Sequence, residues 1–261
     1  MTVPARASDR DATPRFSRRV EFYVKYRPRY PRALVEHLAR EAGLRAGQVV
    51  ADVGSGTGFL SEVFLCHGCT VWGVEPDADM RAAAESLLAP YPHFHSLEGS
   101  AEATGLPDAS VDWVVAGQAF HFFDAERARA EFRRILRPGG HAAICWNERD
   151  GSGSAFMRDY DALLRRYVPD YESVSKRNAA QVDYDAFFGP GGWRVDRFGL
   201  PHPLDREGLR GWLGSARYVP PPDDPAFPRL MAELDALFDA HQVDGQVEFV
   251  YTTSMYWGRL A

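Results

Sequence analysis

The fold is decided by the stretch Val49-Val-Ala-Asp-Val-Gly-Ser-Gly-Thr-Gly-Phe-Leu60, in which a short β-branched run leads into three glycines and then into an apolar segment. This order is typical of a strand, a tight turn and a helix. Gly54, Gly56 and Gly58 leave the turn with little side-chain bulk, so a ligand can lie against its backbone. The helix that follows directs unpaired N–H groups and a partial positive charge at that ligand. The stretch therefore predicts a site for a ligand with a nucleoside or an anionic group.

The spacing of the glycines narrows the choice of ligand. A dinucleotide fingerprint has the form G-x-G-x-x-G and would place its third glycine at position 59, where this chain has Phe59. The carboxylate of Asp52, at the predicted strand end, would repel a pyrophosphate but suits a ligand with an ammonium group. S-adenosylmethionine carries an ammonium, a sulfonium and a carboxylate, and it therefore fits these charges better than NAD does.

The same stretch resembles motif I of the class I S-adenosylmethionine-dependent methyltransferases. The resemblance extends to Glu75 in Thr70-Val-Trp-Gly-Val-Glu-Pro-Asp77, where this family has an acid for the ribose hydroxyls, and to the Leu-Arg-Pro-Gly-Gly turn at 136–140. It implies an α/β fold with a Rossmann-like, seven-stranded, mostly parallel sheet in the order 3-2-1-4-5-7-6 and helical lid insertions. It also implies S-adenosyl-L-methionine as the cofactor and S-adenosyl-L-homocysteine as the product.

The chain divides into five segments in this interpretation. Residues 1–15 are polar and aperiodic, and we expect a disordered tail there. An N-terminal cap spans 16–46, and the S-adenosylmethionine-binding core spans 47–150. The segment 151–192 carries several tyrosines and phenylalanines where the bare fold needs only one helix, so it predicts a helical lid insertion. The segment 193–261 should supply the C-terminal strands of the core, with inserted helices between them.

The resemblance also assigns cofactor contacts along the chain. The Tyr-x-x-Tyr-Arg-Pro-x-Tyr-Pro pattern resembles the N-terminal cap of type-11-like small-molecule methyltransferases, although its tyrosines could instead only pack on the sheet edge. Met80 is either an adenine contact or a core residue. Many relatives have an acid where Ser100 stands, so either Ser100 or the neighbouring Ala101 backbone and Glu102 carboxylate would bind the adenine. The predicted cofactor-binding residues are Tyr23, Tyr26, Arg27, Asp52, Gly54, Ser55, Gly56, Gly58, Glu75, Pro76, Met80, Ser100, Ala101, Glu102 and Gln118.

The predicted chemistry demands few specific residues. Methyl transfer from a sulfonium is a single in-line displacement, so the protein mainly has to position the acceptor and exclude water. A base helps where the accepting atom must lose a proton. His121 is the candidate base, and the alternative is a structural histidine among neighbouring phenylalanines. Aromatic residues in the insertions favour a flat, apolar or heteroaromatic acceptor. The predicted substrate residues are Phe120, His121, Trp146, Tyr160, Arg217 and Tyr218.

Composition limits the other classes of function. The 261 residues are 45% hydrophobic with a net charge of −6, which favours a globular protein and argues against general nucleic-acid binding. The chain has no run of 18 apolar residues, no secretory signal and only three cysteines, so we expect a cytoplasmic monomer or homodimer without membrane association. Cys66-His-Gly-Cys69 has no second pair, which argues against a metal site.

Two alternatives stay open at this point. The first forty residues are locally basic and carry aromatic residues from Phe16 to Tyr30, as an RNA-binding arm would. An RNA methyltransferase is therefore the first alternative. A protein that binds S-adenosylmethionine without turnover is the second, because the chemistry leaves so small a catalytic signature.

Overall fold

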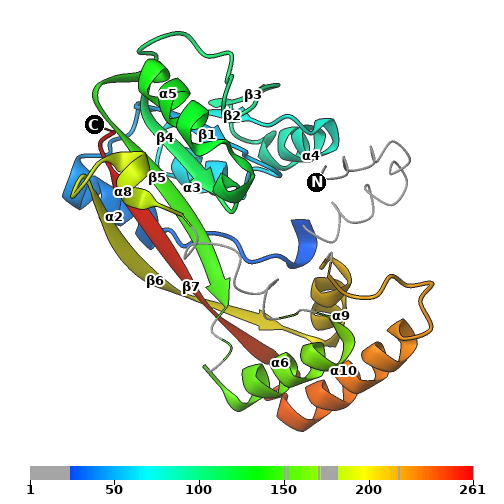
Figure 1. Ribbon diagram of the computed structural model, residues 1–261. Helices are drawn as coiled ribbons and strands as arrows, with labels where there is room; N and C mark the ends of the chain where they lie inside the picture. Colours follow the sequence, from blue (N-terminus) through cyan, green and yellow to red (C-terminus); the bar gives the residue numbers. More distant parts are fainter. Residues whose placement is uncertain are drawn as a thin grey trace, which may run out of the picture.

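The computed structural model describes residues 24–149, 151, 153–169, 171, 182–216 and 218–260 (Figure 1). The strands of its sheet are β1 (Val49–Val53), β2 (Thr70–Val74), β3 (Phe94–Leu97), β4 (Val111–Gly117), β5 (Leu136–Arg149), β6 (Trp193–Leu204) and β7 (Val247–Gly258). They lie in the order β3-β2-β1-β4-β5-β7-β6. The predicted seven-stranded fold and its strand order are therefore confirmed.

The sheet is parallel except at its last strand. β1 pairs in parallel with β2 and β4, whereas β7 runs antiparallel between β5 and β6. β1 and β4 are buried along most of their length, which explains why their sequences are apolar runs rather than an alternating pattern. The carboxyl ends of β1, β2 and β4 meet at one edge of the sheet, which is where ligands of open α/β sheets bind.

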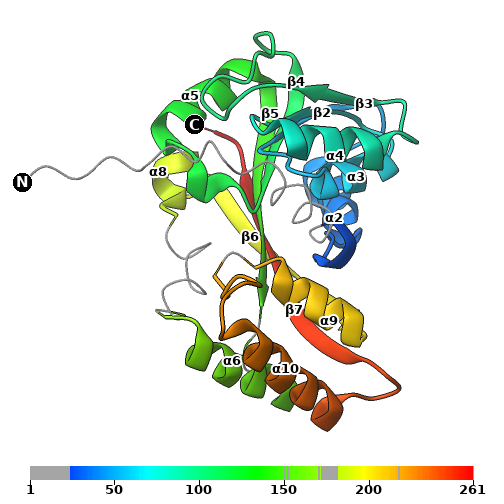
Figure 2. The same cartoon turned by 90° about the vertical axis from the view of Figure 1, so that its right-hand side faces the viewer.

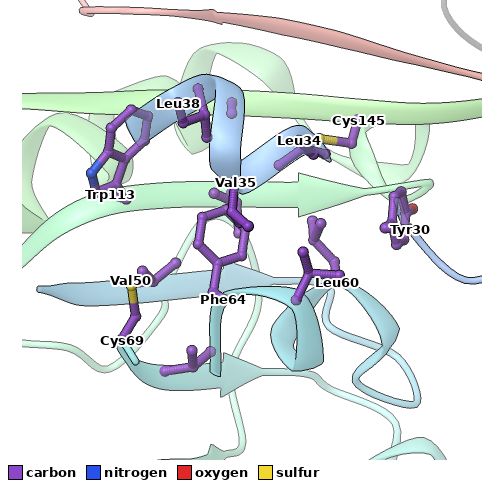
Figure 3. Close-up of a cluster of buried hydrophobic side chains, with 14 of the residues drawn as sticks. Tyr30, Leu34, Val35, Leu38, Val50, Leu60, Phe64, Cys69, Trp113 and Cys145 are labelled. Carbon is purple, nitrogen blue, oxygen red and sulfur yellow. The ribbon is translucent and has the colours of Figure 1, made fainter. Parts of the chain in front are cut away.

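Helices cover both faces of the parallel part of the sheet, and we call this part the core lobe. Figure 3 shows Leu38 and Phe64 packed around Val50 and Trp113 on one face. A second buried cluster on the other face includes Phe132. The core lobe holds the strand ends in place through these two layers. Its helices are α2 (Ala33–Ala42), α3 (Phe59–Cys66), α4 (Ala78–Leu88), α5 (Ala125–Ile135) and α8 (Tyr184–Phe188).

Three further helices form a second region around the extended ends of β5, β6 and β7 (Figures 1 and 2). They are α6 (Ala155–Tyr167), α9 (Arg206–Gly214) and α10 (Phe227–His241). Their apolar faces share one buried cluster with the adjoining ends of β6 and β7, and we call these helices and strand ends the helical lobe. The rings of Tyr160, Trp212 and Phe249 contact one another there, with centroids 4.8 to 5.8 Å apart; Tyr160 meets the other two rings edge to face.

The segment predicted as one lid insertion, 151–192, contributes to both lobes. α6 joins α9 and α10 in the helical lobe. α8 instead packs on the core lobe, where the ring of Phe187 lies 4.7 Å from that of Phe120 and 5.9 Å from that of Phe132. The burial of these aromatic rings in the core lobe separates α8 from α6, which packs in the helical lobe.

Residues 26–30 connect the two lobes, and we call them the N-terminal strap. Tyr26 is buried in the cluster of the helical lobe, and Tyr30 is buried in that of the core lobe. Nδ2 of Asn147 donates a hydrogen bond to the carbonyl of Arg29 at 3.4 Å, and Nε2 of His202 lies 2.8 Å from the carbonyl of Tyr26. Across the part of the chain described here, every helix is too short or too polar to span a membrane.

Candidate functional site

The glycine loop between β1 and α3 adopts the turn that its sequence predicts. Gly54, Gly56 and Gly58 have φ angles of 68°, 55° and 84°, a region that other residues rarely adopt. A Cβ on Gly54 would lie 2.6 Å from Cβ of Ala119, and one on Gly58 would lie 2.5 Å from Cδ1 of Leu88. A Cβ on Gly56 would meet nothing within 4 Å. Gly54 and Gly58 therefore permit close packing of the loop, whereas Gly56 presents bare backbone to open space.

Glu75 lies beside this loop, directly after β2. Its Oε2 accepts a hydrogen bond from the N–H of Gly56 at 2.9 Å, and its Oε1 accepts one from the N–H of Asp77 at 3.0 Å. The N–H of Ser55 donates to the carbonyl of Val74 at 3.2 Å, which ties the loop to the end of β2. Because a carboxylate offers about four lone-pair positions, both oxygens can still accept from a ligand hydroxyl. The structure thus brings the predicted ribose-binding acid next to the bare backbone of Gly56.

Asp52 is buried at the end of β1 with an incomplete set of hydrogen bonds. Oγ of Ser61 donates to Oδ2 at 2.6 Å, but Oδ1 is buried and finds no partner among the described residues. Burial raises the pKa of Asp52 to about 7; the bond from Ser61 opposes this shift, and the charge of Glu75 adds to it. A cationic ligand group nearby would favour the ionised carboxylate. Oγ1 of Thr57 is likewise buried without a partner in this part of the chain.

The loop after β3 contains the residues predicted to contact adenine. Oγ of Ser100 accepts a hydrogen bond from the N–H of Glu102 at 3.3 Å, and Ala101 is buried between them. Oε1 of Glu102 accepts one from the N–H of Asp124 at 2.9 Å, which links this loop to the one after β4. Partial burial alone would raise the pKa of Glu102, but the hydrogen bonds from Asp124 and Ser100 outweigh it and lower that pKa. Glu102 is therefore ionised and held between two loops of the site.

The start of α4 supplies two more of the predicted residues. Met80 is half-buried in the first turn, and Pro76 is exposed just before it. The side chain of Asp77 caps the helix by accepting hydrogen bonds from the N–H groups of Asp79 and Met80, both at 3.0 Å. The cap fixes the path of the chain directly after Glu75.

Gln118 holds the loop after β4 against β5. Its φ of 55° is uncommon outside glycine, and such strain is characteristic of functional loops. The backbone N–H donates to the carbonyl of Cys145 at 2.9 Å, and Nε2 donates to the carbonyl of Asn147 at 2.7 Å. Its Oε1 makes no hydrogen bond with the described residues, which leaves it available to a ligand. Beside it, a Cβ on Gly117 would lie 2.5 Å from the hydroxyl of Tyr30.

His121 follows in the short helix η1 (Phe120–Phe122) and is exposed at the surface of this loop. Its ring centroid lies 3.9 Å from that of Phe122 and 5.7 Å from that of Trp146. Partial burial of the ring lowers the pKa of His121 below its usual value of about 6.5, so the imidazole is neutral at pH 7. A neutral imidazole can accept a proton, as the predicted base requires.

Two of the predicted substrate residues lie in the hydrophobic core, which revises their assignment. Phe120 is buried against Phe187, at 4.7 Å between ring centroids. Trp146 is fully buried, and its Nε1 donates to the hydroxyl of Tyr184 at 2.9 Å. Phe120 has no polar side-chain atom, and the one polar atom of the Trp146 side chain is already bonded, so neither offers a free polar group to a ligand. Both residues lie next to polar loop residues in the sequence, so the sequence alone does not distinguish a substrate contact from a core residue.

Two residues predicted to bind the cofactor pack instead on α9. The ring of Tyr26 lies over Gly211, and its hydroxyl donates to Glu207 at 2.9 Å. Nε of Arg27 donates to Oγ of Ser215 at 3.2 Å. These contacts place both side chains in the helical lobe, as the alternative of structural packing expects, with α9 rather than the sheet edge as the surface. A cofactor contact of Tyr26 or Arg27 stays a prediction.

Of the four remaining predicted site residues, two lie in or beside the helical lobe and two lie outside the described residues. Tyr160 is fully buried in the helical lobe and Tyr218 is half-buried beside it. Tyr23 and Arg217 lie outside the described residues. Sequence reasoning gave no role to three residues at the junction of the lobes. These are Tyr30, Asn147 and Arg149, and only Tyr30 belonged to a motif.

Comparisons with known proteins agree with this geometry. A family model described as a methyltransferase domain matches residues 51–144. An uncharacterized methyltransferase of Mycobacterium tuberculosis is 38% identical over 191 residues, which cover 70% of this chain and 75% of the relative. A solved structure from Anaeromyxobacter dehalogenans, assigned as a type II methyltransferase, has a TM-score of 0.66 at 26% identity and covers 90% of this chain and 98% of its own.

A more distant likeness shows the fold alone. Phosphoethanolamine N-methyltransferase 2 of Haemonchus contortus was solved with phosphomonomethylethanolamine and S-adenosylhomocysteine bound. Its TM-score is 0.54 at 17% identity, over 99% of this chain and 62% of that one.

The cofactor is S-adenosylmethionine. It fits the bare backbone at Gly56, the acid Glu75 and the incompletely bonded Asp52. The chain belongs to the class I S-adenosylmethionine-dependent methyltransferases.

Proposed function

We propose that this methyltransferase modifies a small molecule at a nitrogen or oxygen atom, with a flat or heteroaromatic metabolite as the acceptor. The observation that carries the proposal is the strap, which joins the loop after β4 to the aromatic cluster of the helical lobe. Tyr30 of the strap lies beside Gly117, in the core lobe that also carries the glycine loop and Glu75, and Tyr26 is buried among the aromatic side chains of the helical lobe. Such a junction suits an acceptor that is small enough to be covered on several sides.

Different residues would bind the cofactor, exclude water and take up the proton of the acceptor. S-adenosylmethionine, when bound, supplies a methyl group activated for in-line displacement. Gly56 and Glu75 would hold the nucleoside, and Asp52 would provide negative charge near its amino group. The helical lobe would exclude water, which keeps the acceptor atom reactive. His121 would take the proton of the acceptor on a ring nitrogen, because the lowered pKa leaves its imidazole neutral at pH 7.

The described part of the N-terminal arm favours a small acceptor over RNA. Nζ of Lys25 lies 2.7 Å from Glu207, and Arg29 bonds to Glu62. The guanidinium of Arg27 lies 5.3 Å from the ring centroid of Trp212. These cations are engaged with protein groups, whereas an RNA-binding arm would present them to phosphates. The net charge of −6 also opposes binding of a polyanion.

The test combines calorimetry of S-adenosylhomocysteine with transfer of a labelled methyl group from S-adenosylmethionine to a broad panel of small acceptors and to tRNA. We expect label in a small acceptor and none in tRNA. Glu75→Ala should abolish tight binding of S-adenosylhomocysteine, and His121→Asn should keep that binding while transfer slows about a hundredfold. Label in tRNA alone would establish the RNA alternative. Tight cofactor binding without any labelled product would indicate a non-catalytic binding protein.

A further inference from the structure

Arg149 is the last residue of β5 and lies at the inner side of the helical lobe. Its side chain is 13% exposed and forms an ion pair with Asp161 at 2.8 Å. Its guanidinium carbon lies 5.1 Å from the ring centroid of Tyr160 and 5.6 Å from that of Trp212. A nearly buried guanidinium between aromatic faces is a costly arrangement, and it calls for more than one compensating partner.

The hydrogen bonds of Arg149 are incomplete. Both of its bonds, to Asp161 and to the hydroxyl of Tyr171, leave from Nη2. A guanidinium has five N–H donors, so Nε and Nη1 remain without a hydrogen bond to the described residues. The single carboxylate of Asp161 already shares its Oδ1 with Tyr171, at 2.7 Å. One edge of the Arg149 guanidinium is therefore structural, and the other makes no hydrogen bond within the part of the chain that the structure describes.

Three polar groups near Arg149 are buried and unsatisfied within the described part of the chain. They are the hydroxyls of Tyr160 and Tyr251 and Nε1 of Trp212. Burial raises the pKa of both tyrosines, against the opposing effect of the Arg149 charge, so both phenols keep their protons. Trp212 lies close enough to Tyr251 to affect its pKa, yet the two groups lack hydrogen-bond geometry. Groups of this kind in a native protein usually have a ligand or water as partner.

This cluster adjoins the place where the acceptor must lie. The carbonyl of Asn147 accepts a hydrogen bond from Gln118, in the loop beside the cofactor site. Arg149 follows two residues later on the same strand, and therefore about 7 Å further along it on the same face. Arg27 of the strap lies over Trp212, so a second positive charge adjoins the cluster. The cations Arg149 and Arg27 and the donor Nε1 of Trp212 therefore lie together, with the carboxylate of Asp161 paired to Arg149.

The geometry points to a carboxylate-binding site formed by Arg149, Tyr160, Trp212 and Tyr251, so that the acceptor is a small organic acid. The inference rests on the proposed function and adds the charge of the acceptor. Arg149 and the indole N–H can only donate hydrogen bonds, and they therefore need a ligand that accepts. A planar carboxylate matches a guanidinium edge, and the surrounding rings suit a flat acceptor. A cationic acceptor would be repelled by Arg149 and Arg27.

The test is calorimetry on the protein saturated with S-adenosylhomocysteine. The probes are aromatic and aliphatic carboxylic acids, each paired with its neutral amide, such as benzoate with benzamide, and phenyl phosphate as a second anion. We expect at least one acid to bind ten times more tightly than its amide and than the phosphate. Equal affinity within every acid and amide pair would overturn the inference, and so would tighter binding of phenyl phosphate than of benzoate.

Point variants distinguish an effect on binding of the acid from an effect on folding of the protein. Tyr160→Phe removes only the unsatisfied hydroxyl, so it should leave the melting temperature unchanged or higher while the acid binds five to ten times more weakly. Tyr167→Phe is the matched control on the same helix, because its hydroxyl bonds to Glu233 at 2.6 Å away from the cluster. Arg149→Gln should abolish the preference for acid over amide. Undiminished preference in both Arg149→Gln and Tyr160→Phe would overturn the assignment, even if methyl transfer itself is established.

Failure of the carboxylate-site inference can be distinguished from failure of the proposed methyl transfer. Binding of S-adenosylhomocysteine and labelled transfer report on the glycine loop, whereas the acid preference reports on Arg149. If a labelled acceptor is found, Tyr160→Phe should raise KM for an acid acceptor with little change in kcat, because the hydroxyl binds a part of the acceptor away from the reacting atom. A change in kcat alone would contradict the role as a recognition site.

Discussion

The core lobe and the helical lobe differ in how their residues are brought together. In the core lobe, a continuous stretch from β1 to β5 builds the cofactor side, and the family match at residues 51–144 falls within it. The helical lobe instead joins α6, α9 and α10, from separate parts of the chain, to the ends of β6 and β7 and to Tyr26. The difference suggests that cofactor binding rests on local sequence, whereas acceptor choice rests on long-range packing.

Both lobes nevertheless contain buried polar atoms that lack a hydrogen bond to the described residues. Among the described residues, six buried polar side-chain atoms lack a hydrogen bond. Two of them, on Asp52 and Thr57, lie at the glycine loop, and three lie beside Arg149. The sixth, Nε2 of His37, is 2.9 Å from the carboxylate of Asp196 and thus has a polar neighbour. Unsatisfied atoms are costly, so their concentration at two places supports the two proposed ligand-binding sites.

The difference between the two lobes is tested most strongly by truncating one buried side chain in the hydrophobic core of each. Phe249 and Phe64 are fully buried in the helical and the core lobe respectively. Truncation of either to alanine should reduce the free energy of unfolding by about 3–5 kcal/mol. Phe249→Ala should nevertheless retain affinity for S-adenosylhomocysteine, whereas Phe64→Ala should lose it. Urea denaturation and calorimetry measure both effects; equal loss of cofactor affinity would mean that the lobes fold as one cooperative unit.

A smaller change tests the glycine loop alone. Gly54→Ala places a methyl group 2.6 Å from Cβ of Ala119 at a φ of 68°. The loop must move, and we expect affinity for S-adenosylhomocysteine to fall about 30-fold, which is about 2 kcal/mol. Gly47→Ala is the matched control, because Gly47 has a φ of 83° and nothing within 4 Å of its added Cβ. It should cost stability through backbone strain and leave the affinity unchanged. Equal affinity loss in both variants would indicate strain rather than close packing.

The core lobe was predictable because its signals are local. The glycines, Asp52 and Glu75 lie at strand ends, and parallel strands bring such ends to one edge of a sheet. Asp77 and Asp79, shortly after Glu75, are both capping residue types, and the structure shows that Asp77 is the N-cap. Gln118 could be placed in the loop after β4, but its bond to the Asn147 carbonyl depends on the pairing of β4 with β5.

The helical lobe was not predictable because its contacts span the chain. Tyr26 binds Glu207 across 181 residues, and no local pattern separates that contact from a cofactor contact. Trp146 continues an apolar strand, so its complete burial follows from packing with Tyr184 rather than from its neighbours in sequence. Arg149 was missed because an arginine at a strand end is common, and its aromatic surroundings come from α6 and α9.

Asp52 offers a test of the core lobe through pH. Its pKa of about 7 lies above the usual value of about 3.9. The folded state therefore holds this proton to higher pH than the unfolded state does, and the stability gained below pH 4 is lost as the pH rises through 7. Binding of a cationic amino group favours the ionised form. Affinity for S-adenosylhomocysteine should therefore rise by up to tenfold per pH unit below about 7 and level off above it.

Calorimetry between pH 5.5 and 8, paired with thermal unfolding of the free protein, measures both trends. Asp52→Asn should flatten the dependence of affinity on pH and remove the corresponding loss of stability. Asp159→Asn is a suitable control, since Asp159 lies exposed on α6 in the helical lobe. An affinity that decreases as the pH rises towards 7 would contradict the assignment of Asp52 as the charge partner of the amino group.

The smallest expected effect compares one helix cap from each lobe. Asp77 caps α4 beside the cofactor site, and Asp205 caps α9 by accepting a hydrogen bond from the N–H of Gly208 at 2.7 Å. Replacement of either by alanine should cost about 1 kcal/mol of unfolding free energy. Only Asp77→Ala should also weaken S-adenosylhomocysteine binding, because Glu75 bonds to the N–H of Asp77 and Met80 follows the cap. If Asp205→Ala weakened that binding equally, α9 and the strap would have to act on the cofactor, and the division of labour between the lobes would not hold.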